Sequence, residues 1–174
     1  MVTGFFNLKA PFDTPPFYFR PMKKILVVCL GNICRSPMAH GLLRYKAQKR
    51  GIELEIESAG TSNFHVDESP DKRAQEKMKN YGYDISDLRG RQFIPSDFEE
   101  YDEIFAMDEN NYNDIIAQAK DPSEREKVKF FLSEISGENL SVPDPYFGHE
   151  DGFEHVFKLL DAASDNLLNR IENE

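Results

Sequence analysis

The segment from residue 25 to residue 37 constrains the fold of this chain more than any other. Ile25 to Cys29 form an uninterrupted apolar run rich in β-branched residues, which is typical of a strand buried on both faces. Gly31 and Asn32 follow, two residue types that accept left-handed backbone angles. After Ser36-Pro37, apolar residues recur with helical spacing as far as Gly51. The segment therefore predicts a buried strand that passes through a tight turn directly into a helix.

The same alternation of strand and helix continues along the chain. Apolar runs at 54–59, 103–107 and 128–132 predict three more strands, and helical spacing predicts helices at 71–80, 112–120 and 153–171. Short strands that alternate with helices are typical of a parallel sheet covered on both faces. The fold class expected is α/β, a three-layer doubly wound sandwich with a central four-stranded parallel sheet. Ligands in such folds bind beyond the carboxyl ends of the strands.

Two segments differ in composition. Residues 23–174 read as one domain, whereas residues 1–22 form an N-terminal arm rich in proline and aromatic residues, which disfavours a helix. The sequence leaves open whether this arm docks on the domain, contacts another chain or results from an upstream start codon.

Charge and hydropathy restrict the classes of partner that this chain can be expected to bind. The formal net charge of −10 argues against nucleic acid as a partner and means that a phosphorylated ligand needs a locally attractive site. No apolar run approaches the roughly 18 residues of a membrane span, and no signal-peptide core is present. We therefore expect a cytoplasmic protein without a membrane partner. Its two cysteines, Cys29 and Cys34, are too close for a structural disulfide to remove much chain entropy.

The loop from residue 29 to residue 36, called the cysteine loop below, has the chemistry of an anion site. Backbone N–H groups between a strand and a helix N-terminus can converge on an anion, and the planar fork of Arg35 can grip two oxygens of it. The same field favours the thiolate of Cys29, which could then act as a nucleophile that Ser36 assists. The alternative is that Cys29 only packs in the hydrophobic core. The strand, the turn-forming residues, the arginine and the helix start together favour the anion site instead.

Cys29-Leu30-Gly31-Asn32-Ile33-Cys34-Arg35-Ser36-Pro37 resembles the signature loop of the low-molecular-weight protein tyrosine phosphatases. The segments 58–61 and 142–146 match the same family, so the resemblance extends from about Lys23 to the C-terminus. It implies hydrolysis of phosphotyrosine and small aryl phosphates through a cysteinyl-phosphate intermediate, without metal or cofactor. Inorganic phosphate or sulfate could occupy the loop. The resemblance assigns Cys29 as nucleophile and Arg35 as phosphate clamp, with substrate contacts from Leu30, Gly31, Asn32, Ile33, Cys34 and Ser36.

The resemblance also assigns residues outside the loop. Asp144 lies between two prolines that restrict its backbone, and it resembles the family's general acid and base. Phe64, Tyr146 and Phe147 are implied to form an aromatic wall that flanks the substrate ring, although many relatives have tyrosine at position 147. The alternative is that Tyr146 and Phe147 are loop residues that cover the hydrophobic core.

Ser58 is implied to support the loop by bonding to Asn32. Where relatives often add a histidine to this support, the chain has Leu88. The four histidines make no zinc spacing with the cysteines. Cys34 is close enough to Cys29 to form a reversible disulfide after oxidation, which would inactivate the enzyme.

Three other functions compete with this interpretation. Arsenate reductases share the loop but use cysteines further along the chain, and none follows Cys34. Phosphoarginine phosphatases tend to carry threonine where this chain has Ile33. A phosphate-binding module without catalysis would not need Cys29, Arg35 and Asp144 together.

Overall fold

The computed structural model describes residues 22–136, 140–148 and 150–174. The predicted N-terminal arm lies outside the described residues except for Met22. None of the helices in these ranges is long and apolar enough to cross a membrane.

Four parallel strands form the centre of the molecule. They are β1 (Lys23–Cys29), β2 (Leu54–Gly60), β3 (Glu103–Ala106) and β4 (Val128–Phe130), in the order β2-β1-β3-β4. The α/β class and the four-stranded parallel sheet that the sequence predicts are confirmed. Strand β4 is shorter than the apolar run from 128 to 132, because the chain turns at Phe131 into a short helix.

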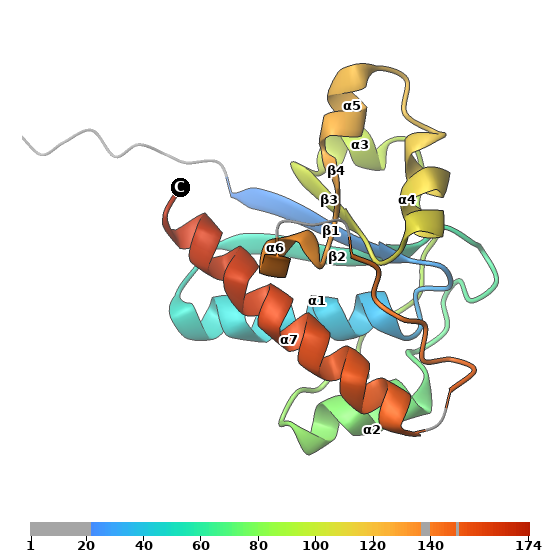
Figure 1. The fold of residues 1–174 in the computed structure, drawn as a ribbon, viewed down its shortest axis with the longest axis vertical. Coiled ribbons are helices and arrows are strands. Elements are labelled where there is room, and N and C mark those ends of the chain that lie inside the picture. Colours follow the sequence, from blue (N-terminus) through green and yellow to red (C-terminus); the bar gives the residue numbers. More distant parts are fainter. Residues whose placement is uncertain (1–21, 137–139, 149) are drawn as a thin grey trace, which may run out of the picture.

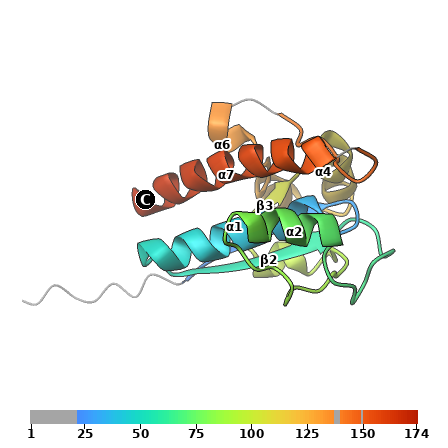
Figure 2. The same cartoon turned by 90° about the horizontal axis from the view of Figure 1, so that it is seen from below.

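Helices cover both faces of the sheet (Figure 1). Helices α1 (Arg35–Arg50), α2 (Lys72–Asn80), α6 (Ser133–Ser136) and α7 (Glu150–Glu172) lie on one side, where α1 packs against α7, as the turned view shows (Figure 2). Helices α3 (Asp97–Glu100), α4 (Glu109–Ile116) and α5 (Pro122–Glu126) lie on the other.

The sequence interpretation misplaced one helix and missed three. Helix α4 was expected at 112–120 but begins at Glu109, because the Asp108 carboxylate accepts a hydrogen bond from the backbone N–H of Asn111 and caps the helix. The short helices α3, α5 and α6 were not expected at all. Each has five residues or fewer, which leaves no room for an apolar period to develop.

Strand β1 shows why the central run is apolar throughout. Ile25 and Val27 belong to the core cluster on the side of α1 and α7, whereas Leu26 and Val28 belong to the cluster on the opposite side. Alternate residues of a strand point to opposite faces, so a strand with helices on both sides needs an apolar residue at every position. From β1 the chain continues to β2 at one edge of the sheet, whereas from β3 it continues to β4 at the other edge. The carboxyl ends of the neighbours β1 and β3 therefore open the crevice where such folds bind ligands.

Candidate active site

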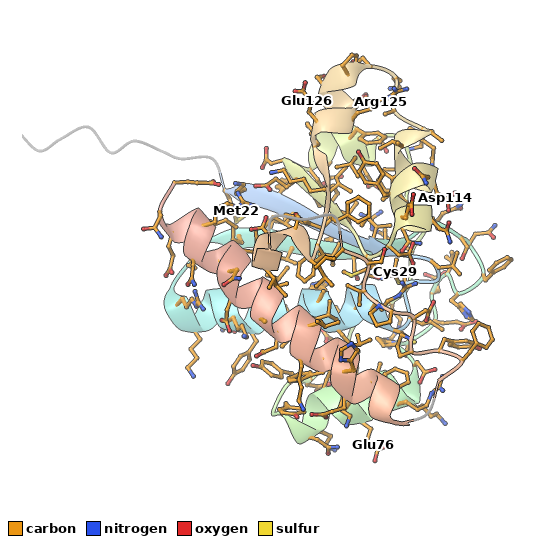
Figure 3. The ribbon with its side chains drawn as sticks, viewed as in Figure 1. Met22, Cys29, Glu76, Asp114, Arg125 and Glu126 are labelled. Atoms are coloured by element: carbon orange, nitrogen blue, oxygen red, sulfur yellow. The ribbon has the colours of Figure 1, made fainter. Side chains whose placement is uncertain are left out.

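The cysteine loop begins where β1 ends, and Cys29 lies next to the start of α1 (Figure 3). The Cys29 thiol is buried, with its sulfur 3.3 Å from the backbone N of Asn32 and 3.1 Å from Oγ of Ser36. Asn32 has a φ of 56°, so the loop uses the left-handed conformation that Asn accepts more readily than most residues. The backbone N–H of Asn32 donates to the sulfur, and a donor in this place stabilises negative charge on a leaving sulfur.

The end of β2 forms the floor under this loop. The backbone N–H groups of Thr61 and Ser62 donate to the carbonyl groups of Cys29 and Leu30, each at 2.9 Å. Gly60 lies so close that a Cβ atom there would be 2.7 Å from the carbonyl oxygen of Leu30. Strand β2 therefore fixes the position of the cysteine loop relative to the sheet through backbone contacts.

Arg35 is 2% exposed and contacts three acceptors with one guanidinium group. Nη1 donates to Oδ2 of Asp108 at 2.6 Å and to the carbonyl of Val142 at 3.1 Å. Nη2 donates to Oδ2 of Asp144 at 2.9 Å. Burial opposes the charge of Arg35, but the adjacent Cys29 and the hydrogen-bonded Asp108 outweigh it and raise the pKa of the guanidinium. A permanent buried cation therefore stands beside the thiol.

Sequence reasoning missed Asp108. It follows β3, the neighbour of β1 in the sheet, so its carboxylate reaches the same edge as the cysteine loop. The available signal was a carboxylate directly after a buried strand, because the carboxyl ends of parallel strands share one edge.

The pocket above the thiol has a volume of about 250 Å³ and a mostly apolar mouth. Phe64 is 77% exposed and Phe147 is 93% exposed, so these rings project from the protein and add little to the core. The lining brings together most of the residues that the sequence singled out, and it adds Ser62 and His65. It consists of Cys29, Leu30, Gly31, Ile33, Cys34, Arg35, Ser62, Phe64, His65, Asp144, Tyr146 and Phe147.

The expected bond between Asn32 and Ser58 is wrong. The Asn32 amide donates to Oγ of Ser36 at 2.8 Å and accepts from the backbone N–H of Arg91 at 2.9 Å. Ser58 instead lies 3.3 Å from Nδ1 of His40, which reaches it from α1. Burial lowers the pKa of His40 to about 4, so a neutral imidazole fills this position. Asn32 thus stabilises the cysteine loop through a bond within it, whereas Ser58 links β2 to α1.

Cys34 also lines the pocket. Burial, followed by the charges of Asp71 and Cys29, raises the pKa of Cys34, so the neutral thiol dominates. Across the described ranges, no group of three or more His, Cys, Asp and Glu side chains is placed to hold a metal ion.

A thiol at the end of a parallel strand, a helix N-terminus above it, a buried arginine and a carboxyl group at the rim together define a cysteine-dependent phosphatase. The comparisons with known proteins agree. The model of the family "Low molecular weight phosphotyrosine protein phosphatase" matches residues 24–174. The chain belongs to this family.

Relatives and solved structures match over almost their full length. A Synechocystis sp. protein named for the same family is 46% identical over 155 residues, which cover 87% of this chain and 98% of the relative. A protein tyrosine phosphatase from Entamoeba histolytica, solved with Hepes in its active site, is 34% identical with a TM-score of 0.81 and covers 87% of this chain and 97% of its own. An arginine phosphatase from Drosophila is 31% identical with a TM-score of 0.79 and covers 85% and 97%.

Proposed function

We propose that this enzyme hydrolyses phosphotyrosine and small aryl phosphates through a cysteinyl-phosphate intermediate, with Cys29 as nucleophile, Arg35 as phosphate clamp and Asp144 as general acid and base. The observation that carries the proposal is their convergence: the thiol, the buried guanidinium and the carboxyl group line one pocket. Binding in this pocket places the phosphorus over the sulfur, with the backbone N–H groups of the loop around its oxygens.

In the first step, the Cys29 thiolate attacks phosphorus, a sulfur–phosphorus bond forms and the bond from phosphorus to the phenol oxygen breaks. Asp144 gives its proton to that oxygen, so a neutral phenol leaves. The loop N–H groups and Arg35 stabilise the charge that spreads over the equatorial oxygens.

In the second step, water attacks the cysteinyl phosphate. Asp144, now a carboxylate, takes a proton from this water while the sulfur–phosphorus bond breaks and inorganic phosphate forms. Ser36, 3.1 Å from the sulfur, donates a hydrogen bond to the departing thiolate and so assists its release.

Asp144 forms an ion pair with Arg35, in which Nη2 donates to Oδ2. The phosphate oxygens of a substrate compete for the same guanidinium N–H groups that hold Asp144. Substrate binding therefore releases the carboxyl group from Arg35 and leaves it free to act as the acid of the first step.

The substrate class follows from the pocket. The exposed aromatic rings at its mouth suit an aryl ester better than a short alkyl ester. The Drosophila relative is an arginine phosphatase, so phosphoarginine is the competing substrate. The apolar Ile33 in the pocket favours phosphotyrosine. The Hepes bound in the Entamoeba relative is a sulfonate, which supports phosphate or sulfate as occupants of this loop.

The test combines two variants with one trapping experiment. Cys29→Ser should abolish hydrolysis of para-nitrophenyl phosphate, and Asp144→Asn should slow it by about 10²-fold or more. Rapid acid quench of the wild-type enzyme with a labelled substrate should trap one phosphate per chain on Cys29. Full activity of Cys29→Ser, or an absent thiophosphate, refutes the mechanism. A comparison of phosphotyrosine and phosphoarginine peptides at one pH decides between the substrates.

We further propose that peroxide inactivates the enzyme reversibly by joining Cys29 to Cys34, in a cytoplasmic setting where both thiols are normally reduced. Both cysteines are free and line the same pocket. Thiol counting after peroxide and again after dithiothreitol tests this, and irreversible loss with Cys34 still free refutes it.

A further inference from the structure

Arg73 lies outside the set of pocket-lining residues but contacts the loop that carries Asp144. It is in the first turn of α2, and its Nη1 donates to the carbonyl oxygen of Tyr146 at 3.1 Å. Its guanidinium carbon is also 5.4 Å from the centre of the Tyr146 ring and 4.9 Å from that of Phe153 at the start of α7. Arg73 therefore joins two helices to the loop of the proposed general acid.

The guanidinium of Arg73 is held in place from its other side. Asp71, the N-cap of α2, accepts from Nε of Arg73 at 3.0 Å and from Nη2 at 2.8 Å. The same capping carboxylate also accepts from the backbone N–H of Arg73. A two-point bond of this kind fixes the plane of the guanidinium, which leaves Nη1 aimed at Tyr146.

This arrangement completes a chain of hydrogen bonds from the cysteine loop to the general acid. The backbone N–H of Asp71 donates to the carbonyl of Ile33, 2.8 Å away in the cysteine loop. Arg73 then links Asp71 to Tyr146, and the backbone N–H of Tyr146 donates to Oδ1 of Asp144 at 3.0 Å. The position of the proposed acid relative to the nucleophile loop thus depends on Arg73.

Substrate binding makes this link more important. Arg35 also holds Asp144, but a bound phosphate would compete for the N–H groups of Arg35. The contact of Arg73 with Tyr146 does not compete with phosphate, so it persists in the complex. We propose that Arg73 is a positioning residue that keeps Asp144 in line with the leaving oxygen once substrate has displaced Asp144 from Arg35. This inference rests on the proposed role of Asp144 as general acid.

A structural role alone would have a different signature. The side chain of Arg73 is 42% exposed, whereas that of its partner Asp71 is 14% exposed. An ion pair whose cation is this accessible to solvent contributes little to stability. Arg44 offers a matched control, because its side chain is 40% exposed and forms a comparable two-point bond with Asp87 away from the pocket. Replacement by lysine keeps the charge of either residue but removes the planar fork.

The experiment measures kcat/KM of Arg73→Lys, Arg73→Ala, Arg44→Lys and Asp144→Asn on aryl phosphates whose leaving phenols differ in acidity. This parameter covers the steps up to departure of the phenol, and poor leaving groups depend most on the general acid. Arg73→Lys should lose about tenfold or more on phenyl phosphate and less than about twofold on the most acidic phenol. Arg73→Ala should lose at least as much, and Arg44→Lys should match wild type across the series. Denaturant midpoints check that both lysine variants remain equally folded.

Each outcome decides one claim. Asp144→Asn should show the steepest dependence on the leaving group, and a flat dependence refutes the proposed function itself. If Asp144→Asn is steep while Arg73→Lys loses activity equally on every substrate, or not at all, the inference about Arg73 is wrong. The double variant Arg73→Lys with Asp144→Asn should be no slower than Asp144→Asn alone. Multiplied losses would show that Arg73 acts independently of the acid, which also overturns the inference.

Discussion

Gly60→Ala should disturb the cysteine loop although Gly60 itself does not line the pocket. A Cβ atom at this position would lie 2.7 Å from the carbonyl oxygen of Leu30, 3.0 Å from the carbonyl carbon of Gly31 and 3.1 Å from the backbone N of Asn32. All three are backbone atoms, so no side-chain rotation can relieve the contact. Either the end of β2 or the loop itself must move.

The expected magnitude follows from the size of the overlap. Relief requires a shift of roughly 0.5 Å, and catalytic groups displaced by about 1 Å lose about 10²-fold in rate. We expect kcat/KM to fall about tenfold, equivalent to about 1.4 kcal/mol of transition-state stabilisation, together with a loss of stability of about 1–3 kcal/mol from overpacking.

The assay pairs steady-state kinetics on para-nitrophenyl phosphate with phosphate binding by calorimetry and urea unfolding. Gly51→Ala is the control: Gly51 has a φ of 70° and open space around it, so alanine there should cost about 1 kcal/mol of stability and leave kcat/KM unchanged. Wild-type kinetics and phosphate affinity in Gly60→Ala would refute the claim that β2 positions the cysteine loop.

Two further predictions concern stability against pH. Burial lowers the pKa of His40 to about 4, so protons favour the unfolded chain below about pH 6.5, and the wild type should lose about 2 kcal/mol from this residue between pH 7 and pH 5. His40→Gln should show a smaller loss over that interval in urea unfolding; an identical loss would contradict the assignment. Despite burial, the pKa of Glu103 is lowered to about 2 by hydrogen bonds from Arg170, Lys129 and Lys23. Its stabilisation is therefore complete above about pH 4.5 and lost as the pH falls towards 2. Glu103→Gln should cost about 3 kcal/mol at pH 7, and much less in the same titration at pH 2.5. A pH-independent difference would argue against the ion pairs.

The cysteine loop could be predicted because its information is local. The buried strand, the turn formers and Arg35 follow one another within a few residues, and each has a backbone or chemical preference that neighbours in sequence reinforce. The class of the fold follows for the same reason, since apolar period and length distinguish strands from helices without reference to distant residues.

The supports of the site depend on contacts that no local pattern encodes. Asp108, His40 and Arg73 come from three different elements, and they reach the site only because the order of the strands and the packing of α1 and α2 bring them there. The expected partner of Asn32 was wrong because its amide has several acceptors and donors within reach, and geometry alone chooses among them.

The sequence by itself determined the cysteine loop, with Cys29 and Arg35 in it, and the parallel sheet that presents this loop, because strand, turn and helix are specified by consecutive residues. Only the tertiary structure decided that the guanidinium of Arg35 bonds to both Asp108 and Asp144, and that Arg73 joins α2 to the loop that carries Asp144. The physical reason is that a hydrogen bond depends on ångström-scale placement of both partners, and for residues far apart in sequence the packing of the whole fold sets that placement.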